Sequence, residues 1–255
     1  MKRSSGVRTA ATVTVSVLSL ALVTACSTEE SSGSKSLGSE SAAPAEAAKA
    51  FSASELEKLL LAQGEVKGYQ VDSGDDTLPK SKTEVKTDNA QCDPLAWATA
   101  GLAPGDTDAN ASNSVTEDKA STATAQPEDA EDIFDVDVTY VGLSSYEGDG
   151  AAQAMKAVSD GVSACSGGYG LAAGGEDSKV TKVSSLEGSG LGEESVAFAE
   201  DVDMDGEGTA TFHTEVVREG NTIATFYTVN FASFGTGEAA EIPASVVEAQ
   251  ITKLK

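Results

Sequence analysis

The stretch from Val136 to Gly167, VDVTYVGLSSYEGDGAAQAMKAVSDGVSACSG, places a strand directly before a helix. Over residues 133–143, large apolar residues alternate with Asp and Thr, which predicts a strand with one buried face and one face that carries carboxylates. Over residues 149–165, apolar residues recur at steps of four and three, which predicts an amphipathic helix. Cys165 belongs to this apolar stripe, so we expect its side chain on the buried face of the helix.

The segments on either side extend the pattern into a mixed α and β domain. Upstream, turn signals and apolar periodicity predict helices over 51–63 and 92–98 and strands over 68–73 and 83–87. Downstream, they predict strands over 180–186, 195–200, 209–218 and 222–234, and a helix that opens at Pro243. This order of elements predicts an α+β fold with a mainly antiparallel sheet, in a single domain over 51–255.

The segment 103–132 interrupts this pattern. It is acidic, rich in Ser, Thr and Ala, and nearly free of large apolar residues. A segment of this length inside a domain is usually either a lid over a site or disordered. We favour a disordered acidic loop.

The start of the chain has the features of a bacterial lipoprotein. Three basic residues among the first eight precede an apolar run over 9–24, which is typical of a secretory signal peptide and is too short for a bilayer span of about 20 residues. The sequence Val23-Thr24-Ala25-Cys26 resembles a lipobox. It implies that a signal peptide over 1–25 is removed and that Cys26 is acylated, with palmitate among the attached chains. The alternative is an ordinary signal peptide with an incidental Cys.

Composition describes the mature chain as a polar tether and an acidic domain. Residues 26–50 are mainly Ser, Gly, Ala and Glu, which predicts a flexible tether behind the lipidated Cys26. The chain carries 41 Asp and Glu against 17 Lys and Arg, which argues against nucleic acid as a partner and against direct electrostatic contact with anionic lipid. We therefore expect an acidic domain held at the outer face of the cytoplasmic membrane by its lipid anchor.

The two remaining cysteines, Cys92 and Cys165, form an even pair in an oxidising compartment, and we predict a disulfide bond between them. The alternative is two free, buried thiols. Trp97 is the only Trp and lies close to Cys92 in the sequence. We expect Trp97 to pack near that cysteine rather than to act as a ligand platform.

His213 is the only His and falls on a predicted strand. With no matched nucleophile it is a poor candidate for a catalytic triad, so we expect a solvent-facing strand residue. Zinc is disfavoured because one His and an oxidised Cys pair cannot supply the usual ligands. Asp135 and Asp137 lie two residues apart on one strand face and are candidates for an acid/base pair, but such spacings arise by chance in so acidic a chain.

The run from Asp201 to Gly208 has a partial resemblance to a calcium loop. Asp201, Asp203 and Asp205 recur at steps of two and are followed by Gly, as at the start of that loop. The template then needs a carboxylate at its twelfth position, which here is Phe212. We therefore favour an acidic β-turn and expect no resident metal and no cofactor.

Three stretches resemble the PknH-like extracellular domain family. They are the opening stretch 136–167, VVREGNTIATFYTVN over 216–230, and IPASVVEAQITKLK over 242–255. Members of that family occur as the outer sensor portions of actinobacterial serine/threonine kinases and as free lipoproteins. The resemblance implies a central antiparallel sheet flanked by helices, with a cleft proposed to take a ligand. The kinase sensors carry two disulfides whereas one Cys pair is available here, so no ligand-binding residues are carried over.

Together these features predict a non-catalytic, lipid-anchored sensor or ligand-binding lipoprotein whose small-molecule or protein ligand is unknown. One alternative is a structural or interaction lipoprotein of the envelope, and another is a carboxylate-based envelope hydrolase. A large concave pocket with apolar walls and a few polar groups would favour ligand binding. Convergence of His213 and several carboxylates in such a pocket would favour the hydrolase.

Overall fold

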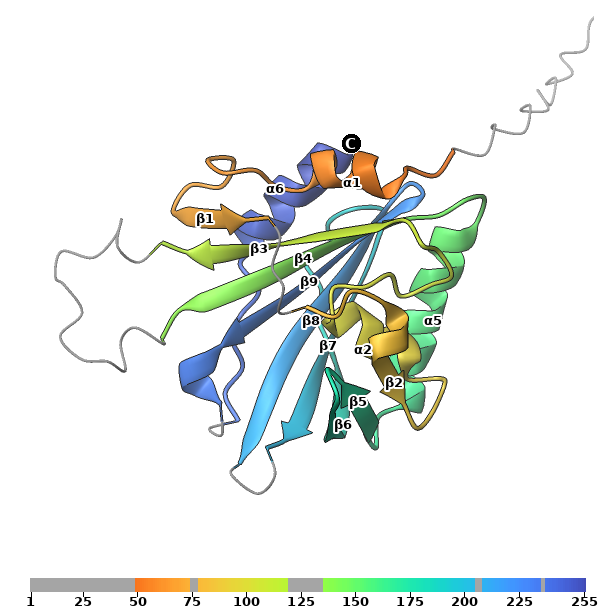
Figure 1. Cartoon of the computed structure of the whole chain (residues 1–255), viewed down its shortest axis with the longest axis vertical. Helices are drawn as coiled ribbons and strands as arrows, with labels where there is room; N and C mark the ends of the chain where they lie inside the picture. The colour runs from red at the N-terminus through yellow and green to blue at the C-terminus, as the bar shows by residue number, and fades with distance from the viewer. Residues whose placement is uncertain (1–48, 74–77, 119–134, 205–207, 235–236) are drawn as a thin grey trace, which may run out of the picture. The chain divides into compact units, whose positions relative to one another are not determined.

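One nine-stranded β-sheet forms the centre of the domain, and every neighbouring pair of strands in it is antiparallel (Figure 1). This confirms the predicted α+β class and the mainly antiparallel sheet. The structure is a computed structural model that describes residues 49–73, 78–118, 135–204, 208–234 and 237–255. The predicted signal peptide, the predicted lipidation site Cys26 and nearly all of the predicted tether lie outside the described residues.

The strands follow the order β1-β3-β4-β9-β8-β7-β6-β5-β2 across the sheet. They are β1 (Tyr69–Asp72), β2 (Val85–Thr87), β3 (Asn110–Glu117), β4 (Asp137–Ser145), β5 (Tyr169–Ala173), β6 (Glu176–Leu186), β7 (Glu194–Asp203), β8 (Thr209–Glu219) and β9 (Thr222–Asn230). The α-helices are α1 (Ala53–Leu59), α2 (Asp93–Thr99), α5 (Gly150–Ala164) and α6 (Ala244–Leu254), and short 3₁₀ turns η1 and η2 span Lys82–Glu84 and Phe231–Ser233.

Helices cover both faces of the sheet. On one face α2 and α5 pack over apolar side chains that include Phe198, Val216 and Ile223. On the other face α1 and α6 pack over a second cluster that includes Val217 and Phe226. Within the described part of the chain, no helix combines the length and the apolar character needed to cross a membrane.

The two covered faces correct the prediction that the strand around 133–143 has one solvent-exposed face. From Thr139 to Ser145, every residue of β4 is buried. The polar side chains among them are hydrogen-bonded: the hydroxyl oxygens of Thr139 and Thr228 lie 2.9 Å apart across β4 and β9, and the Ser144 hydroxyl donates to the Tyr146 hydroxyl at 3.1 Å. Alternation of polar and apolar residues therefore overstated the exposure of this strand, because small hydroxyl side chains can be buried when they are hydrogen-bonded.

The prediction of a disordered loop over 103–132 is wrong for the part that the structure describes. Residues 110–117 form β3, which pairs with both β1 and β4. This strand has one large apolar residue, Val115, and its polar side chains are used as hydrogen-bond donors: Asn113 Nδ2 donates to the Leu61 carbonyl at 2.8 Å. Pairing on both edges outweighs its weak strand pattern. Residues 119–134 lie outside the described residues.

The first helix is shorter than the predicted 51–63. The predicted capping box is present, with the Ser52 N–H donating to Glu55 Oε2 at 2.8 Å, but α1 ends at Leu59. Gln250 of α6 takes over the backbone beyond that point, accepting from the Leu61 N–H at 3.0 Å and donating to the Leu59 carbonyl at 2.8 Å. The buried amide satisfies backbone groups that a longer helix would have paired internally.

Candidate functional site

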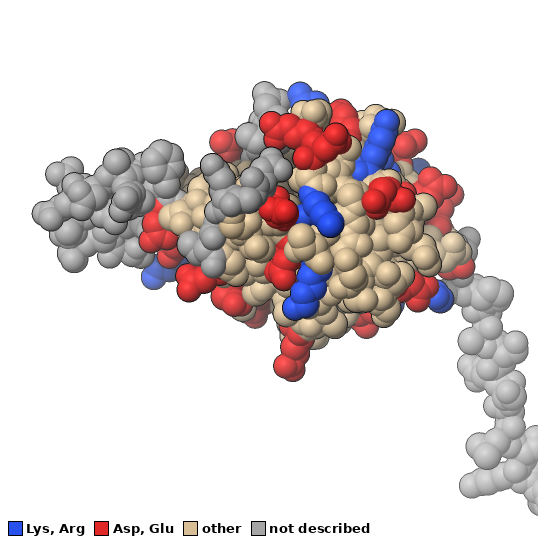
Figure 2. All heavy atoms as spheres, turned by 90° about the horizontal axis from the view of Figure 1, so that it is seen from below, with Lys and Arg blue, Asp and Glu red and all other residues tan. Residues whose placement is uncertain are grey.

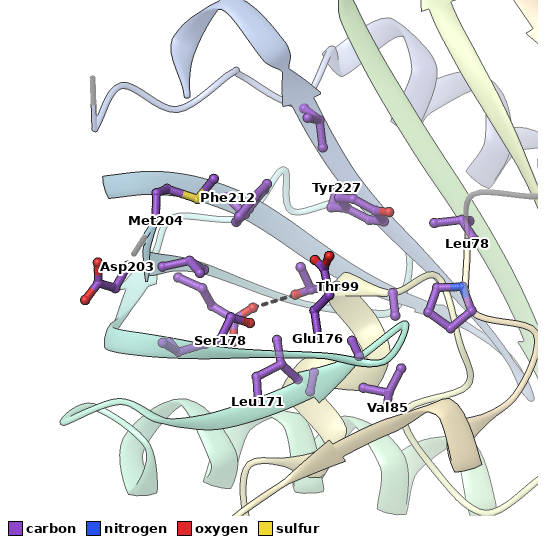
Figure 3. Close-up of a pocket in the computed structure, with 18 of the residues that line it drawn as sticks. Leu78, Val85, Thr99, Leu171, Glu176, Ser178, Asp203, Met204, Phe212 and Tyr227 are labelled. Carbon is purple, nitrogen blue, oxygen red and sulfur yellow. Dashed lines mark hydrogen bonds between the residues drawn. The ribbon is translucent and has the colours of Figure 1, made fainter. Parts of the chain in front are cut away.

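A cleft of about 1050 Å³ opens on the sheet face that carries α2 and α5, beside the end of α2 (Figure 3). Seven consecutive strands of the sheet contribute lining residues, in the order β4, β9, β8, β7, β6, β5 and β2. The sheet therefore curves around this space. We call this space the Glu200 cleft, after the buried carboxyl group described below.

Aromatic side chains are concentrated in the Glu200 cleft. The rings of Tyr140 and Tyr227, directly paired residues of β4 and β9, stack with their centroids 4.8 Å apart. Phe234 packs edge-on against Phe212 at 5.9 Å. Six of the chain's 13 aromatic residues line the cleft, namely Tyr140, Tyr169, Phe212, Tyr227, Phe231 and Phe234. The cleft thus offers large apolar surfaces and π faces to a bound molecule.

Glu200 lies on β7 and lines the cleft, yet its exposed fraction is only 2%. Its Oε1 accepts a hydrogen bond from the Tyr169 hydroxyl at 2.5 Å, and its Oε2 accepts one from the Thr99 hydroxyl at 2.7 Å. Thr99 Oγ1 lies 2.9 Å from Thr214 Oγ1, so the network joins α2, β5, β7 and β8. Among the described residues, no Lys, Arg or His forms an ion pair with Glu200.

Burial dominates the protonation behaviour of this network. It raises the pKa of the Glu200 carboxyl, although the hydrogen bonds from Tyr169 and Thr99 act in the opposite direction. Burial also raises the pKa of the Tyr169 phenol, and the adjacent Glu200 raises it further. Tyr169 therefore stays protonated at physiological pH and remains a hydrogen-bond donor to Glu200.

We expect the Glu200→Gln variant to be more stable than the wild type at neutral pH. The amide can still accept from Tyr169 and can donate to Thr99, while it removes a buried charge. Folding raises the pKa of the Glu200 carboxyl. The contribution of this group to the free energy of unfolding is therefore complete below the unfolded-state pKa of about 4.3, and it is lost as pH rises through the folded-state pKa. Urea denaturation from pH 4 to pH 8 should show the variant gaining stability over the wild type as pH rises. A difference that does not change with pH would contradict this assignment.

Three further acidic residues border the cleft: Glu176 and Asp177 at the start of β6, and Asp203 at the end of β7. By the alternation of the two strands, Glu176 shares the face of Glu200, whereas Asp177 and Asp203 belong to the other face. Figure 3 shows Asp203 at one end of the cleft and Leu78 at the other, with Glu176 between them. None of the described residues that line the cleft is Lys, Arg or His. Acidic side chains are spread widely over the face of the molecule that Figure 2 shows, so the buried Glu200 distinguishes this site more than its rim does.

The predicted disulfide between Cys92 and Cys165 is present, with the two Cα atoms 5.9 Å apart. Cys92 immediately precedes α2, Cys165 immediately follows α5, and both are buried. The bond therefore holds α2, the helix that brings Thr99 to the cleft, against α5. Trp97 packs against the apolar cluster that includes Cys92 and does not line the cleft.

His213 and the Asp135/Asp137 pair lie outside the cleft. His213 points to the opposite sheet face from Phe212, and its side chain is 19% exposed rather than solvent-facing as predicted. Its Nδ1 is 3.9 Å from Glu241 Oε1, in the segment before α6, which accounts for its partial burial. Asn230 Nδ2 donates to one oxygen of Asp135 and one of Asp137, each at 2.8 Å.

The predicted acidic turn over 201–208 begins later than expected. Asp201 and Asp203 belong to β7, where they pair with Thr211 and Thr209. Asp201 Oδ1 accepts a hydrogen bond from the Thr211 hydroxyl at 2.9 Å, which ties it to the sheet. Asp205 lies outside the described residues. Over the ranges that the structure describes, no group of three or more His, Cys, Asp or Glu side chains is placed to hold a metal ion.

One feature of the sequence distinguishes Glu200 from the other acidic residues. Val196, Phe198, Glu200 and Val202 alternate along β7, so a carboxyl group occupies an apolar position of the strand. Its partners Thr99 and Tyr169 were not recognisable from the sequence. Tyr169 falls in β5, a Gly- and Ala-rich segment that was not predicted as a strand.

No protein-family model matches the chain, and no curated protein matches it. Among solved structures, it is similar to the extracellular domain of PknH from Mycobacterium tuberculosis, with 13% sequence identity and a TM-score of 0.46. The match covers 81% of this chain and 95% of that domain. A similarity at this level does not indicate a function for the chain.

Proposed function

We propose that the chain is a non-catalytic binding domain that acts outside the cytoplasm and takes an apolar or aromatic small molecule into the Glu200 cleft. The observation that carries the proposal is the cleft of about 1050 Å³ with six aromatic residues in its lining. Small-molecule sites are typically concave, largely apolar and furnished with a few polar groups. The Glu200 network supplies those polar groups.

A binding role accounts for the site better than catalysis does. His213 and the Asp135/Asp137 pair, the residues with the best prior claim to acid/base chemistry, do not line the cleft. Both oxygens of Glu200 accept hydrogen bonds from hydroxyl groups, an arrangement that holds its side chain in place.

The features of residues 1–26 support the finer part of the proposal, a lipid anchor at Cys26 on the outer face of the membrane. Mass spectrometry of the native membrane-bound protein should find an acylated Cys26 at its N-terminus, and an unmodified one would exclude the anchor.

Binding can be tested with N-phenyl-1-naphthylamine, a neutral aromatic probe whose fluorescence rises in apolar sites. We expect saturable binding by the full chain and an affinity about threefold to tenfold lower in the Phe231→Ser variant, because one aromatic contact is lost. Phe231 lines the cleft and is 52% exposed, so its replacement should leave the fold intact.

Phe51→Ser is the matched control for this measurement. Phe51 is 39% exposed, a similar state to that of Phe231, but it does not line the cleft. The control should bind the probe as the wild type does. Absence of saturable binding, or equal losses in the two variants, would overturn the proposed function.

A further inference from the structure

We infer that the Glu200 cleft selects organic cations, that is, ligands with an apolar or aromatic body and a positively charged nitrogen. This inference rests on the proposed function and adds the chemical class of the ligand. Its evidence is the combination of buried charge, missing counter-charge and aromatic faces in one cavity.

The charges of the cleft all have one sign. Two carboxyl groups belong to its face of the sheet, those of Glu176 on β6 and Glu200 on β7. Asp177 and Asp203 also border the cleft, but their side chains alternate to the other face, where Asp203 is opposite Lys179. No basic residue lies among the described residues of the lining. A bound anion would therefore meet only like charges on this face, whereas a cation would meet the carboxyl groups of Glu176 and Glu200.

Glu200 is the strongest part of this argument. Both of its oxygens accept hydrogen bonds from the neutral hydroxyls of Tyr169 and Thr99, and no Lys, Arg or His among the described residues forms an ion pair with it. Burying a carboxylate without a counter-ion is unfavourable, and a ligand that brings a cation to its side of the cleft offsets that cost. A neutral ligand of the same shape gains nothing from this group.

The aromatic side chains favour the same class of ligand. The stacked pair of Tyr140 and Tyr227, together with Phe212, lies in the cleft that also holds Glu200. An ammonium group near the face of an aromatic ring is attracted by the ring quadrupole, and more strongly where water is excluded. Carboxyl groups and ring faces thus recognise a cationic nitrogen in two independent ways.

Displacement of N-phenyl-1-naphthylamine from the full chain tests the inference. The competitors share one octyl chain and differ only in head group: octyltrimethylammonium, octanol and octyl sulfate, each used below its aggregation concentration. We expect the ammonium compound to displace the probe at a concentration at least about tenfold below that of octanol, with octyl sulfate the weakest.

Glu200→Gln should reduce the preference for the ammonium compound over octanol by severalfold, measured as the ratio of the two displacing concentrations within the same variant. Glu215→Gln is the matched control, because Glu215 is also buried and accepts a hydrogen bond from the Ser189 hydroxyl but does not line the cleft. Equal displacement by the three competitors, or a preference that survives both Glu200→Gln and Glu176→Gln, would overturn the inference. Failure of the probe itself to bind would instead overturn the proposed function.

Discussion

Replacing Cys92 and Cys165 together with Ala is expected to lower the free energy of unfolding by about 4 kcal/mol. The bond closes a loop with a sequence separation of 73 residues. In the loop-entropy model, a cross-link of this span removes enough conformational freedom from the unfolded chain to account for a loss of that size. Urea denaturation of the oxidised protein and the double variant, compared through their midpoints and slopes, measures it.

The same bond can be tested without mutation. Both cysteines are buried, so reductant should act on the wild type only when urea opens the structure, and it should then shift the unfolding midpoint toward that of the double variant. The double variant itself should not respond to reductant. Alkylation of the denatured, unreduced protein followed by peptide mapping should leave Cys92 and Cys165 unlabelled. Labelling of both residues would show that the thiols are free.

The Gly142→Ala variant is expected to lose about 3 kcal/mol of stability, which is large for the addition of one methyl group. A Cβ at this position would lie 2.4 Å from the Gly101 carbonyl oxygen and 2.6 Å from Thr225 Oγ1. The Gly101 backbone cannot easily retreat, because its N–H donates to the Ala98 carbonyl and its own carbonyl accepts from Asn110 Nδ2. The methyl group would therefore push the end of α2 away from the sheet.

This displacement has a consequence for the cleft, since Thr99 ends α2 and donates to Glu200. We expect Gly142→Ala to weaken binding of N-phenyl-1-naphthylamine as well as stability. Gly167→Ala is the matched control, because a Cβ there has no atom within 4 Å, and its stability should change by no more than about 0.5 kcal/mol. Equal stability of the two variants would mean that α2 does not depend on its close approach to Gly142.

Sequence reasoning succeeded where the pattern is local. The period of apolar residues predicted α5 and α6, and the strands predicted over 209–218 and 222–234 correspond to β8 and to β9, which ends at Asn230. It also predicted the Cys92–Cys165 bond, because a pair of cysteines in an oxidising compartment leaves one pairing. It failed for β3 and β5, whose residues have weak strand preference and become strands only because neighbouring strands supply hydrogen-bond partners.

The candidate site depended on folding in a way that no local pattern reveals. The residue types along the chain were sufficient to predict most of the order of helices and strands, the acidic character of the domain and the cysteine pairing. The Glu200 cleft required the curvature of the sheet, which brings Tyr169, Thr99 and Glu200 together from positions up to 101 residues apart in the chain. Side chains that far apart meet only after the strands have paired and α2 has docked. The chain alone therefore determined which elements form, and the tertiary structure decided which side chains share a cavity.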